Sequence, residues 1–202
     1  MHEARPRLGV IGGSFDPPHL GHLVIASEAH AQFALERVLF VPAAAPPHKG
    51  LEEHTAADVR LEMTALAVAE DMRFVESGLE IEHGLSYTID TLRAVAERFP
   101  GRDLVFIMGS DSLLQLDTWY DPEGILARCT LAVAPRPGDD PALVAAAAAR
   151  WGSARVTIIE APPVGVSSRQ IRARVAEGLP IRYLVPQAVA ELIVGRGLYG
   201  RP

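Results

Sequence analysis

Short apolar runs alternate with segments of helical periodicity along most of the chain, and this alternation limits the possible folds more than any other feature. We expect buried strands at residues 8–11, 38–41, 104–108, 131–134 and 156–159. We expect helices at residues 21–33, 57–71, 88–99, 168–177 and 187–194, the last two ended by Gly178 and Gly195. This order predicts an α/β fold, doubly wound, with helices on both faces of a mostly parallel sheet.

Neither an internal repeat nor a Gly/Ser-rich linker divides the sequence, so we expect a single domain over residues 1–202. In sheets of this type, ligands bind beyond the carboxyl ends of the strands, where the strand order reverses. The loops that follow the strands are therefore the places to search for chemistry.

Composition excludes several classes of function. The formal net charge of −6 argues against a basic surface that binds nucleic acid, although a pocket can still be locally positive. No apolar run reaches the ~18 residues of a membrane span, and the polar N-terminus lacks the apolar core of a signal peptide. Cys129 is the only cysteine, and the apolar run after it predicts buried packing. We expect a cytoplasmic protein without a membrane partner.

The loop after the first predicted strand, residues 12–22 (GGSFDPPHLGH), joins a buried strand to a helix. Gly12 and Gly13 let the backbone approach a ligand closely. The helix N-terminus offers free N–H groups and the positive end of a dipole, which suits phosphate. His19 and His22 are three residues apart, so both imidazoles can face the same side.

Three other types of site fit this loop less well. The Gly-Lys-Ser/Thr ending of a Walker-type phosphate loop is absent, and so are the three spaced glycines of a dinucleotide fingerprint. A zinc site is a weaker alternative, because His19 and His22 have no obvious third ligand.

A second candidate for phosphate binding is residues 166–172 (VSSRQIR), which follow the last predicted strand. Ser167 or Ser168 can cap the helix, and Arg172 lies one turn into it. Taken alone, the segment fits an ordinary capped helix with solvated arginines better than a phosphate site.

Together the two segments resemble known motifs. Gly13 with residues 19–22 resembles the T/SxGH-type loop of the nucleotidyltransferase superfamily, and residues 166–172 resemble its Ser-Ser-Thr-x-Ile-Arg signature. Further motifs make nearly the whole chain similar to the bacterial nicotinate-nucleotide adenylyltransferase family. They are Pro-Pro-His-Lys at 46–49, Arg-Leu-Glu-Met at 60–63, Ser-Tyr-Thr-Ile-Asp-Thr-Leu at 86–92, Gly-Ser-Asp-Ser-Leu at 109–113, Trp119, and Arg-Pro-Gly at 136–138. Arg169 and His83 depart from the residues common in the family.

The resemblance implies a Rossmann-like nucleotidyltransferase fold and a reaction of NAD biosynthesis. ATP would transfer its adenylyl group to nicotinic acid mononucleotide, giving nicotinic acid adenine dinucleotide and pyrophosphate. The acceptor phosphate would attack directly, in line, without a covalent enzyme intermediate. Mg²⁺ would be carried by the ATP phosphates, and no protein metal site is implied.

The resemblance also implies which residues form the site. His19, His22 and Arg172 would act in catalysis. The ATP-binding residues would be Gly12, Gly13, Ser14, Phe15, His19, His22, Gly109, Asp111, Ser167, Ser168 and Arg172. The acceptor-binding residues would be Lys49, Thr88, Trp119, Tyr120 and Arg136. An indole can stack on a pyridine ring, and backbone N–H groups near Thr88 and Tyr120 could recognise its carboxylate.

The sequence also allows other roles for some of these residues and other functions for the protein. Trp119 and Tyr120 could belong partly to the core, and Asp111 could be a simple helix cap. The protein could use another acceptor such as phosphopantetheine, or it could be a nucleotide-binding regulator without catalysis. A transfer-RNA synthetase fragment is disfavoured by the acidic charge and by the lack of a Lys-Met-Ser-Lys-Ser string.

Overall fold

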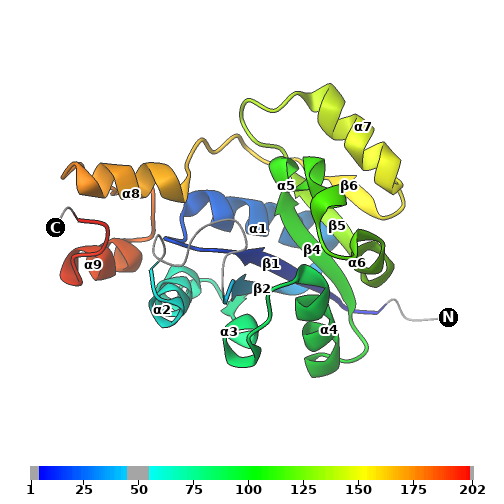
Figure 1. Cartoon of the computed structure of the whole chain (residues 1–202), viewed down its shortest axis with the longest axis horizontal. Helices are drawn as coiled ribbons and strands as arrows, with labels where there is room; N and C mark the ends of the chain where they lie inside the picture. Colours follow the sequence, from blue (N-terminus) through cyan, green and yellow to red (C-terminus); the bar gives the residue numbers. More distant parts are fainter. Residues whose placement is uncertain (1–4, 45–54, 201–202) are drawn as a thin grey trace.

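Six strands form one sheet at the centre of the molecule (Figure 1). The computed structural model describes residues 5–44 and 55–200. The strands are β1 (Arg7–Gly13), β2 (Leu35–Pro42), β3 (Phe74–Glu76), β4 (Asp103–Gly109), β5 (Cys129–Ala134) and β6 (Val156–Ile158). Their order is β3-β2-β1-β4-β5-β6, and every neighbouring pair is parallel. The order reverses between β1 and β4, which confirms the doubly wound topology.

The helices of the described residues follow the strands in the chain. They are α1 (Leu20–Phe33), α2 (Ala57–Val68), α3 (Leu79–His83), α4 (Thr88–Arg98), α5 (Ser110–Leu114), α6 (Pro122–Arg128), α7 (Pro141–Trp151), α8 (Ser168–Ala176) and α9 (Gln187–Gly195), with a 3₁₀ turn, η2 (Leu116–Thr118). Every strand and helix predicted above is present, with small shifts at its ends.

Four of the observed strands and α-helices have no counterpart among the predicted ones, whereas α7 contains the Ala-rich run at residues 145–149 that the sequence indicates to be part of a helix. The elements β3, α3 and α5 are too short to give a periodic pattern. Helix α6 does carry local signals, because the Asp121 side chain accepts a hydrogen bond from the Gly124 amide (3.0 Å) and Pro122 occupies its first turn.

The two predicted helix stops differ in conformation. Gly178 lies two residues beyond the end of α8 and takes the left-handed φ of 70° that favours glycine. The helix α9 ends at Gly195, as predicted, although Gly195 is its last residue and the left-handed conformation is taken by Gly197 (φ 61°).

Each face of the sheet has its own apolar core. Along β1, Val10 belongs to the core beneath α3, α4 and α6, whereas Ile11 belongs to the core beneath α1. This alternation is the two-residue period of a strand buried on both sides. The consequence is that β1 lies in the middle of the protein, with its carboxyl end fixed from both faces.

A third apolar cluster joins the last two helices to α2. It is formed by Met63 and Ala67 of α2, Ile171 of α8, Val189 and Ile193 of α9, and Ile181 and Val185 between them. Figure 1 shows α8 and α9 beside α2 at one end of the sheet. The cluster fixes the N-terminus of α8 near the carboxyl end of β1.

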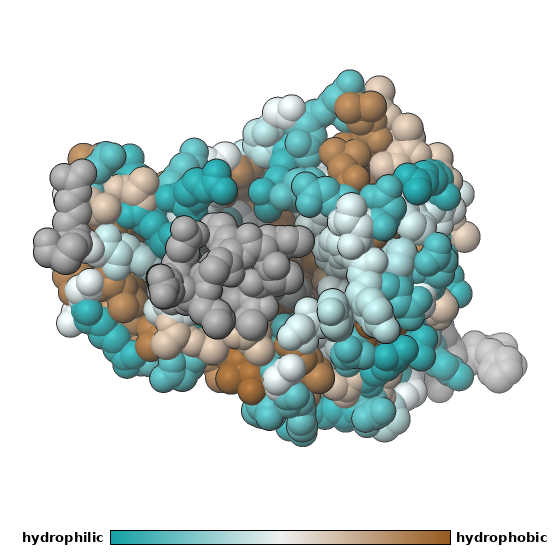
Figure 2. Space-filling model, in the orientation of Figure 1, coloured by the Kyte–Doolittle hydropathy of each residue, from teal (hydrophilic) through white to brown (hydrophobic). Residues whose placement is uncertain are grey.

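The surface is largely hydrophilic on the face shown in Figure 2, with hydrophobic side chains over α7. Leu143 of α7 is 59% exposed. Within residues 5–44 and 55–200, the helices are all too short or too polar to cross a membrane.

The single thiol gives a direct test of this packing. Cys129 is 2% exposed, its Sγ donates to the Ile125 carbonyl (3.3 Å), and burial raises the pKa of the thiol to about 12. We expect a thiol-reactive dye to leave the folded protein unlabelled at neutral pH and to label it in denaturing urea. Rapid labelling of the folded protein would contradict the buried position.

Candidate active site

A cavity of about 550 Å³ lies at the carboxyl ends of β1 and β4, where the topology predicted a ligand site. Its walls come from the end of β1, the start of α1, the end of β4, the segment after β5 and the loop before α8. The predicted site residues that line it are Gly12, Gly13, Ser14, His19, His22, Gly109, Trp119, Arg136, Ser167 and Ser168. Folding therefore brings together residues from several separate stretches of the chain.

The first loop (residues 14–19) connects β1 to α1 and lies between the cavity and the protein interior. Phe15 takes a left-handed φ of 46° and is 1% exposed, with its ring edge-on to that of His22 at 4.9 Å. The Phe15 side chain is thus part of the core beneath α1, and only its backbone is available for the predicted contact with ATP.

His19 and His22 lie together at the N-terminus of α1. Their rings are stacked, with centroids 3.7 Å apart and planes inclined by 20°. The His19 amide donates to Nδ1 of His22 (3.2 Å), which fixes the orientation of that imidazole. A Cβ at Gly21 would lie 3.0 Å from the His19 ring, so glycine at this position allows the ring to sit against the helix.

Burial and positive charge keep both imidazoles neutral. Desolvation, and then the Arg136 guanidinium, lower the pKa of His19 to about 4. Desolvation also lowers the pKa of His22 well below its usual value, with smaller effects from His19 and Arg136. Nδ1 of His19 is buried without a hydrogen-bond partner among the described residues. The pair therefore faces a cavity that favours the arrival of negative charge.

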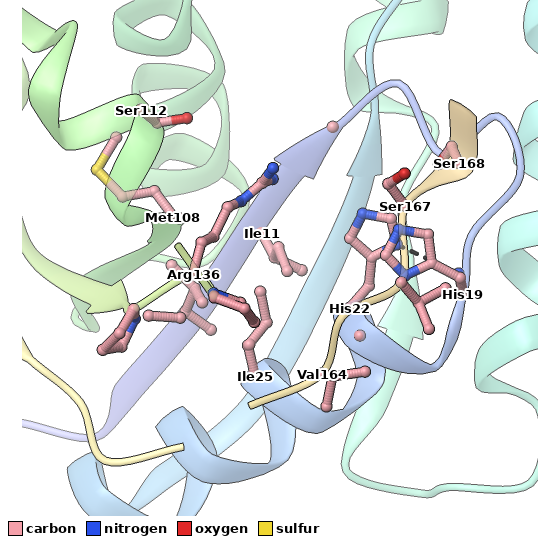
Figure 3. Close-up of a pocket in the computed structure, with 18 of the residues that line it drawn as sticks. Ile11, His19, His22, Ile25, Met108, Ser112, Arg136, Val164, Ser167 and Ser168 are labelled. Atoms are coloured by element: carbon pink, nitrogen blue, oxygen red, sulfur yellow. Dashed lines mark hydrogen bonds between the residues drawn. The ribbon is translucent and has the colours of Figure 1, made fainter. Parts of the chain in front are cut away.

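Figure 3 shows the arrangement of these groups around the cavity. His19, His22 and Ser167 lie on one side, and Arg136 with Met108 and Ser112 lies on the other. Two helix N-termini, those of α1 and α8, thus border one space together with a guanidinium, which is a suitable environment for a polyphosphate.

The N-terminus of α8 is capped as the sequence predicts. Ser167 Oγ accepts from the Gln170 amide (3.3 Å), and the Gln170 side chain accepts from the Ser167 amide (3.1 Å). Ser168 lines the cavity, but its hydroxyl donates to the Pro17 carbonyl (2.8 Å). Ser168 therefore also connects α8 to the first loop.

Arg172 does not lie in the wall of the cavity. Its Nη1 donates to the carbonyl of Asp16 (2.6 Å), on the outer side of the first loop. The resemblance implied direct contact of Arg172 with phosphate, whereas the structure gives it a contact that holds the loop. The carbonyl contact occupies Nη1 only, and Nε and Nη2 still carry N–H groups that can donate to a phosphate.

Asp111 and Arg136, predicted for different substrates, form an ion pair with 3.0 Å between Oδ1 and Nε. A Cβ at Gly109 would lie 2.5 Å from Asp111 Oδ1 and 2.9 Å from Arg136 Nε, so this glycine leaves room for the pair. Ser110, which is completely buried, accepts from the Arg136 amide (2.9 Å) and donates to Asp139. Ser110 thereby fixes the segment that carries Arg136.

The remaining acceptor residues lie in different environments. Trp119 is half-buried, lines the cavity and has its ring edge-on to Phe106, with centroids 6.3 Å apart. Tyr120 is 60% exposed, and neither it nor Thr88 lines the cavity. Lys49, with the whole Pro-Pro-His-Lys motif, lies outside the described residues.

Two structural residues of the site, Ser110 and Arg60, belong to motifs quoted from the sequence but were given no role there. Arg60 is 1% exposed and donates to the carbonyls of Ser14 (2.9 Å), Ala44 (3.3 Å) and Thr55 (3.0 Å). A signal was available, because Arg60 lies on the same face of α2 as the buried Met63 and Thr64. A charged residue within a buried helix face needs a specific partner.

The described residues offer little to a directly bound metal ion. Within this part of the chain, His, Cys, Asp and Glu side chains form no group of three or more that could hold one. His19 and His22 accordingly have no third ligand there, which leaves the zinc alternative without structural support.

Comparisons with known proteins agree with this geometry. A family model described as cytidylyltransferase-like matches residues 10–174. The chain is 45% identical to a "Probable nicotinate-nucleotide adenylyltransferase" of Thermus thermophilus and 41% identical to a protein of the same name from Geobacter sulfurreducens. These matches cover 96% of this chain and 99% and 98% of the relatives.

A solved structure supports the fold. The chain is similar to Plasmodium falciparum nicotinic acid mononucleotide adenylyltransferase complexed with NaAD, with a TM-score of 0.79 and 18% identity over 96% of this chain and 97% of that one. At this identity the likeness concerns the fold alone.

The low pKa of His19 predicts how stability depends on pH. The unfolded chain binds a proton at His19 below about pH 6.5, whereas the folded protein does so only near pH 4. Stability should therefore fall as the pH drops through this interval, by roughly 1 kcal/mol at about pH 5.5 from His19. Urea unfolding of wild type and His19→Asn at several pH values measures it, and the variant should lose part of the slope. Parallel pH profiles would contradict the neutral, buried imidazole.

Proposed function

The chain belongs to the cytidylyltransferase-like family, and we propose that it transfers the adenylyl group of ATP to nicotinic acid mononucleotide. The products are nicotinic acid adenine dinucleotide and pyrophosphate, and the reaction is a step in NAD biosynthesis. The observation that carries this proposal is the cavity in which stacked His19 and His22, at the N-terminus of α1, face the capped N-terminus of α8.

The chemistry needs no general base. An acceptor phosphate is already ionised at neutral pH, and one of its oxygens attacks the α-phosphorus of ATP. That new P–O bond forms as the bond from the α-phosphorus to the bridging oxygen of pyrophosphate breaks, in line and without a covalent enzyme intermediate. Catalysis then consists of positioning the two phosphates and stabilising the charge on the oxygens around the α-phosphorus and on the leaving group.

We assign these tasks to the residues around the cavity. The N–H groups at the end of β1 and in the first loop, with His19 and His22, contact the ATP phosphates. Neutral imidazoles suit this task because each can donate one N–H, and a bound triphosphate favours their protonation. Ser167 and the α8 N-terminus contact the phosphates from the opposite wall. Arg172 supports the first loop in the free protein through Nη1, and we assign contact with the phosphates to its other N–H groups.

Magnesium fits this site as a companion of the substrate. Asp111 is ion-paired with Arg136, and the described residues provide no cluster of acidic or histidine ligands. Mg²⁺ would therefore be held mainly by phosphate oxygens, where it supplies positive charge that offsets part of the charge of ATP.

The acceptor occupies the side of the cavity near Trp119. The indole lines the cavity and can stack on the pyridine ring of the nucleotide. The backbone near Thr88 and Tyr120 is proposed to recognise the carboxylate of the pyridine ring. Arg136 and Lys49 are proposed to bind the phosphate of the mononucleotide. ATP and this mononucleotide are the only partners that we propose, and we propose the cytoplasm as the place of the reaction.

The experiment that tests the function measures pyrophosphate release from ATP and Mg²⁺ with two acceptors in parallel. We expect rapid release with nicotinic acid mononucleotide and much slower release with nicotinamide mononucleotide, because only the former has the carboxylate. The control is His22→Ala, which should lower kcat by roughly two orders of magnitude or more while the far-UV circular dichroism is unchanged. Release with neither acceptor would refute the reaction, and equal use of both would refute the carboxylate recognition.

The position of Trp119 predicts an effect on one substrate only. Trp119→Ala removes the stacking surface, so we expect KM for nicotinic acid mononucleotide to rise about tenfold, the loss typical of one stacked ring. KM for ATP should change little. Steady-state kinetics with each substrate varied in turn measures both constants. An unchanged acceptor KM would show that the indole belongs to the core and not to the acceptor site.

A further inference from the structure

The carbonyl groups of the first loop accept hydrogen bonds from side chains of α2 and α8. The loop accepts from Arg60 at Ser14, from Arg172 at Asp16 and from Ser168 at Pro17. Ser168 lines the cavity, whereas Arg60 and Arg172 do not, so these two arginines support the loop from behind.

The side chain of Asp16 adds further contacts to those of the loop carbonyls. The whole residue is buried, although its side chain is a carboxylate. Oδ2 accepts from the Thr55 amide (3.3 Å), and Oδ1 accepts from the hydroxyl of Tyr199 (2.5 Å). A buried carboxylate is stable only with donors around it, so the position of Asp16 depends on these partners.

Tyr199 reaches Asp16 from a distant part of the sequence. It lies in the segment that follows α9, takes a left-handed φ of 63°, and has its hydroxyl 3.8 Å from Sδ of Met63 in α2. Burial, and then the hydrogen bond to Asp16, raise the pKa of the phenol, so the group stays protonated and remains a donor at neutral pH.

We propose that Tyr199 is a positioning residue for adenylyl transfer, because its hydroxyl holds Asp16 and thereby sets the loop that places His19 and His22. The proposal rests on the function proposed above. Tyr199 does not line the cavity. It acts through Asp16, whose backbone is continuous with the residues at the start of α1.

The shape of the first loop explains why a single hydroxyl matters. Residues 14–19 belong to neither β1 nor α1, so their position depends on side-chain contacts more than on a backbone ladder. Loss of one hydrogen bond to a charged group alters an equilibrium by roughly tenfold or more. A loop that leaves its position in most molecules lowers the rate by a similar factor, because the two imidazoles move with it.

The test is Tyr199→Phe, which removes one oxygen atom and keeps the ring. The matched control is Tyr183→Phe, the same change at a residue that is 77% exposed. We expect Tyr199→Phe to lower kcat about tenfold with the KM for nicotinic acid mononucleotide within about twofold of wild type. Tyr183→Phe should behave as wild type.

A second measurement does not depend on the reaction. Amide hydrogen exchange of a peptide that spans residues 14–22, followed in the free protein by mass spectrometry, should be several-fold faster in Tyr199→Phe than in wild type or in Tyr183→Phe. A peptide from β4 should exchange at the same rate in all three proteins, which separates a local effect from a general loss of stability.

The outcomes are distinct. Slower turnover together with faster exchange of the loop supports the positioning role. Normal kcat, or a lowered kcat with unchanged exchange of the loop, overturns it. If wild type releases no pyrophosphate with nicotinic acid mononucleotide, the proposed function fails, and the exchange experiment still decides whether Tyr199 sets the loop.

Discussion

The guanidinium of Arg60 donates to three backbone carbonyls from separate segments, and the shape of the cavity depends on this buried contact. A loop that presents its N–H groups to an anion must turn carbonyl oxygens away from it. Those oxygens then need donors in the interior. Arg60 supplies one to Ser14, and Arg172 supplies another to Asp16. The donors behind the loop are thus as necessary to an anion site as the groups that face the anion.

The same arrangement keeps the cavity of an acidic protein free of negative charge. The chain has a formal net charge of −6, but Arg136 borders the cavity and the two imidazoles in it are neutral. Two carboxylates near the site do not face the cavity as free charges. Asp111 forms an ion pair with Arg136, and Asp16 is buried behind the loop. The cavity therefore presents N–H donors and helix N-termini to an anion, while the negative charge of the surface stays outside.

The third apolar cluster gives the C-terminal helices a role in this geometry. It packs α8 and α9 against α2, which is the helix that carries Arg60. The N-terminus of α8 and the carbonyl-binding side chain of α2 are therefore fixed relative to one another. Because both contact the first loop, packing at one end of the sheet is transmitted to the two histidines through short, direct contacts.

The alternation of apolar runs and helical segments was sufficient to predict the α/β fold, the parallel sheet and the place of the cavity. These depend on local periodicity, which a sequence displays directly. The strand–loop–helix string around His19 and His22 and the cap at Ser167 were visible for the same reason. The short elements β3, α3 and α5 were not, since each is too brief to show a period.

Tertiary structure alone decided which partner each polar side chain takes. Nothing in the sequence indicated that Asp111 pairs with Arg136, that Arg172 turns to the Asp16 carbonyl, or that Tyr199 donates to the Asp16 carboxylate. Asp16 and Tyr199 are 183 positions apart in the chain. Periodicity and capping report interactions within a few residues, whereas a hydrogen bond between distant segments exists only once the packing of the core has brought them together.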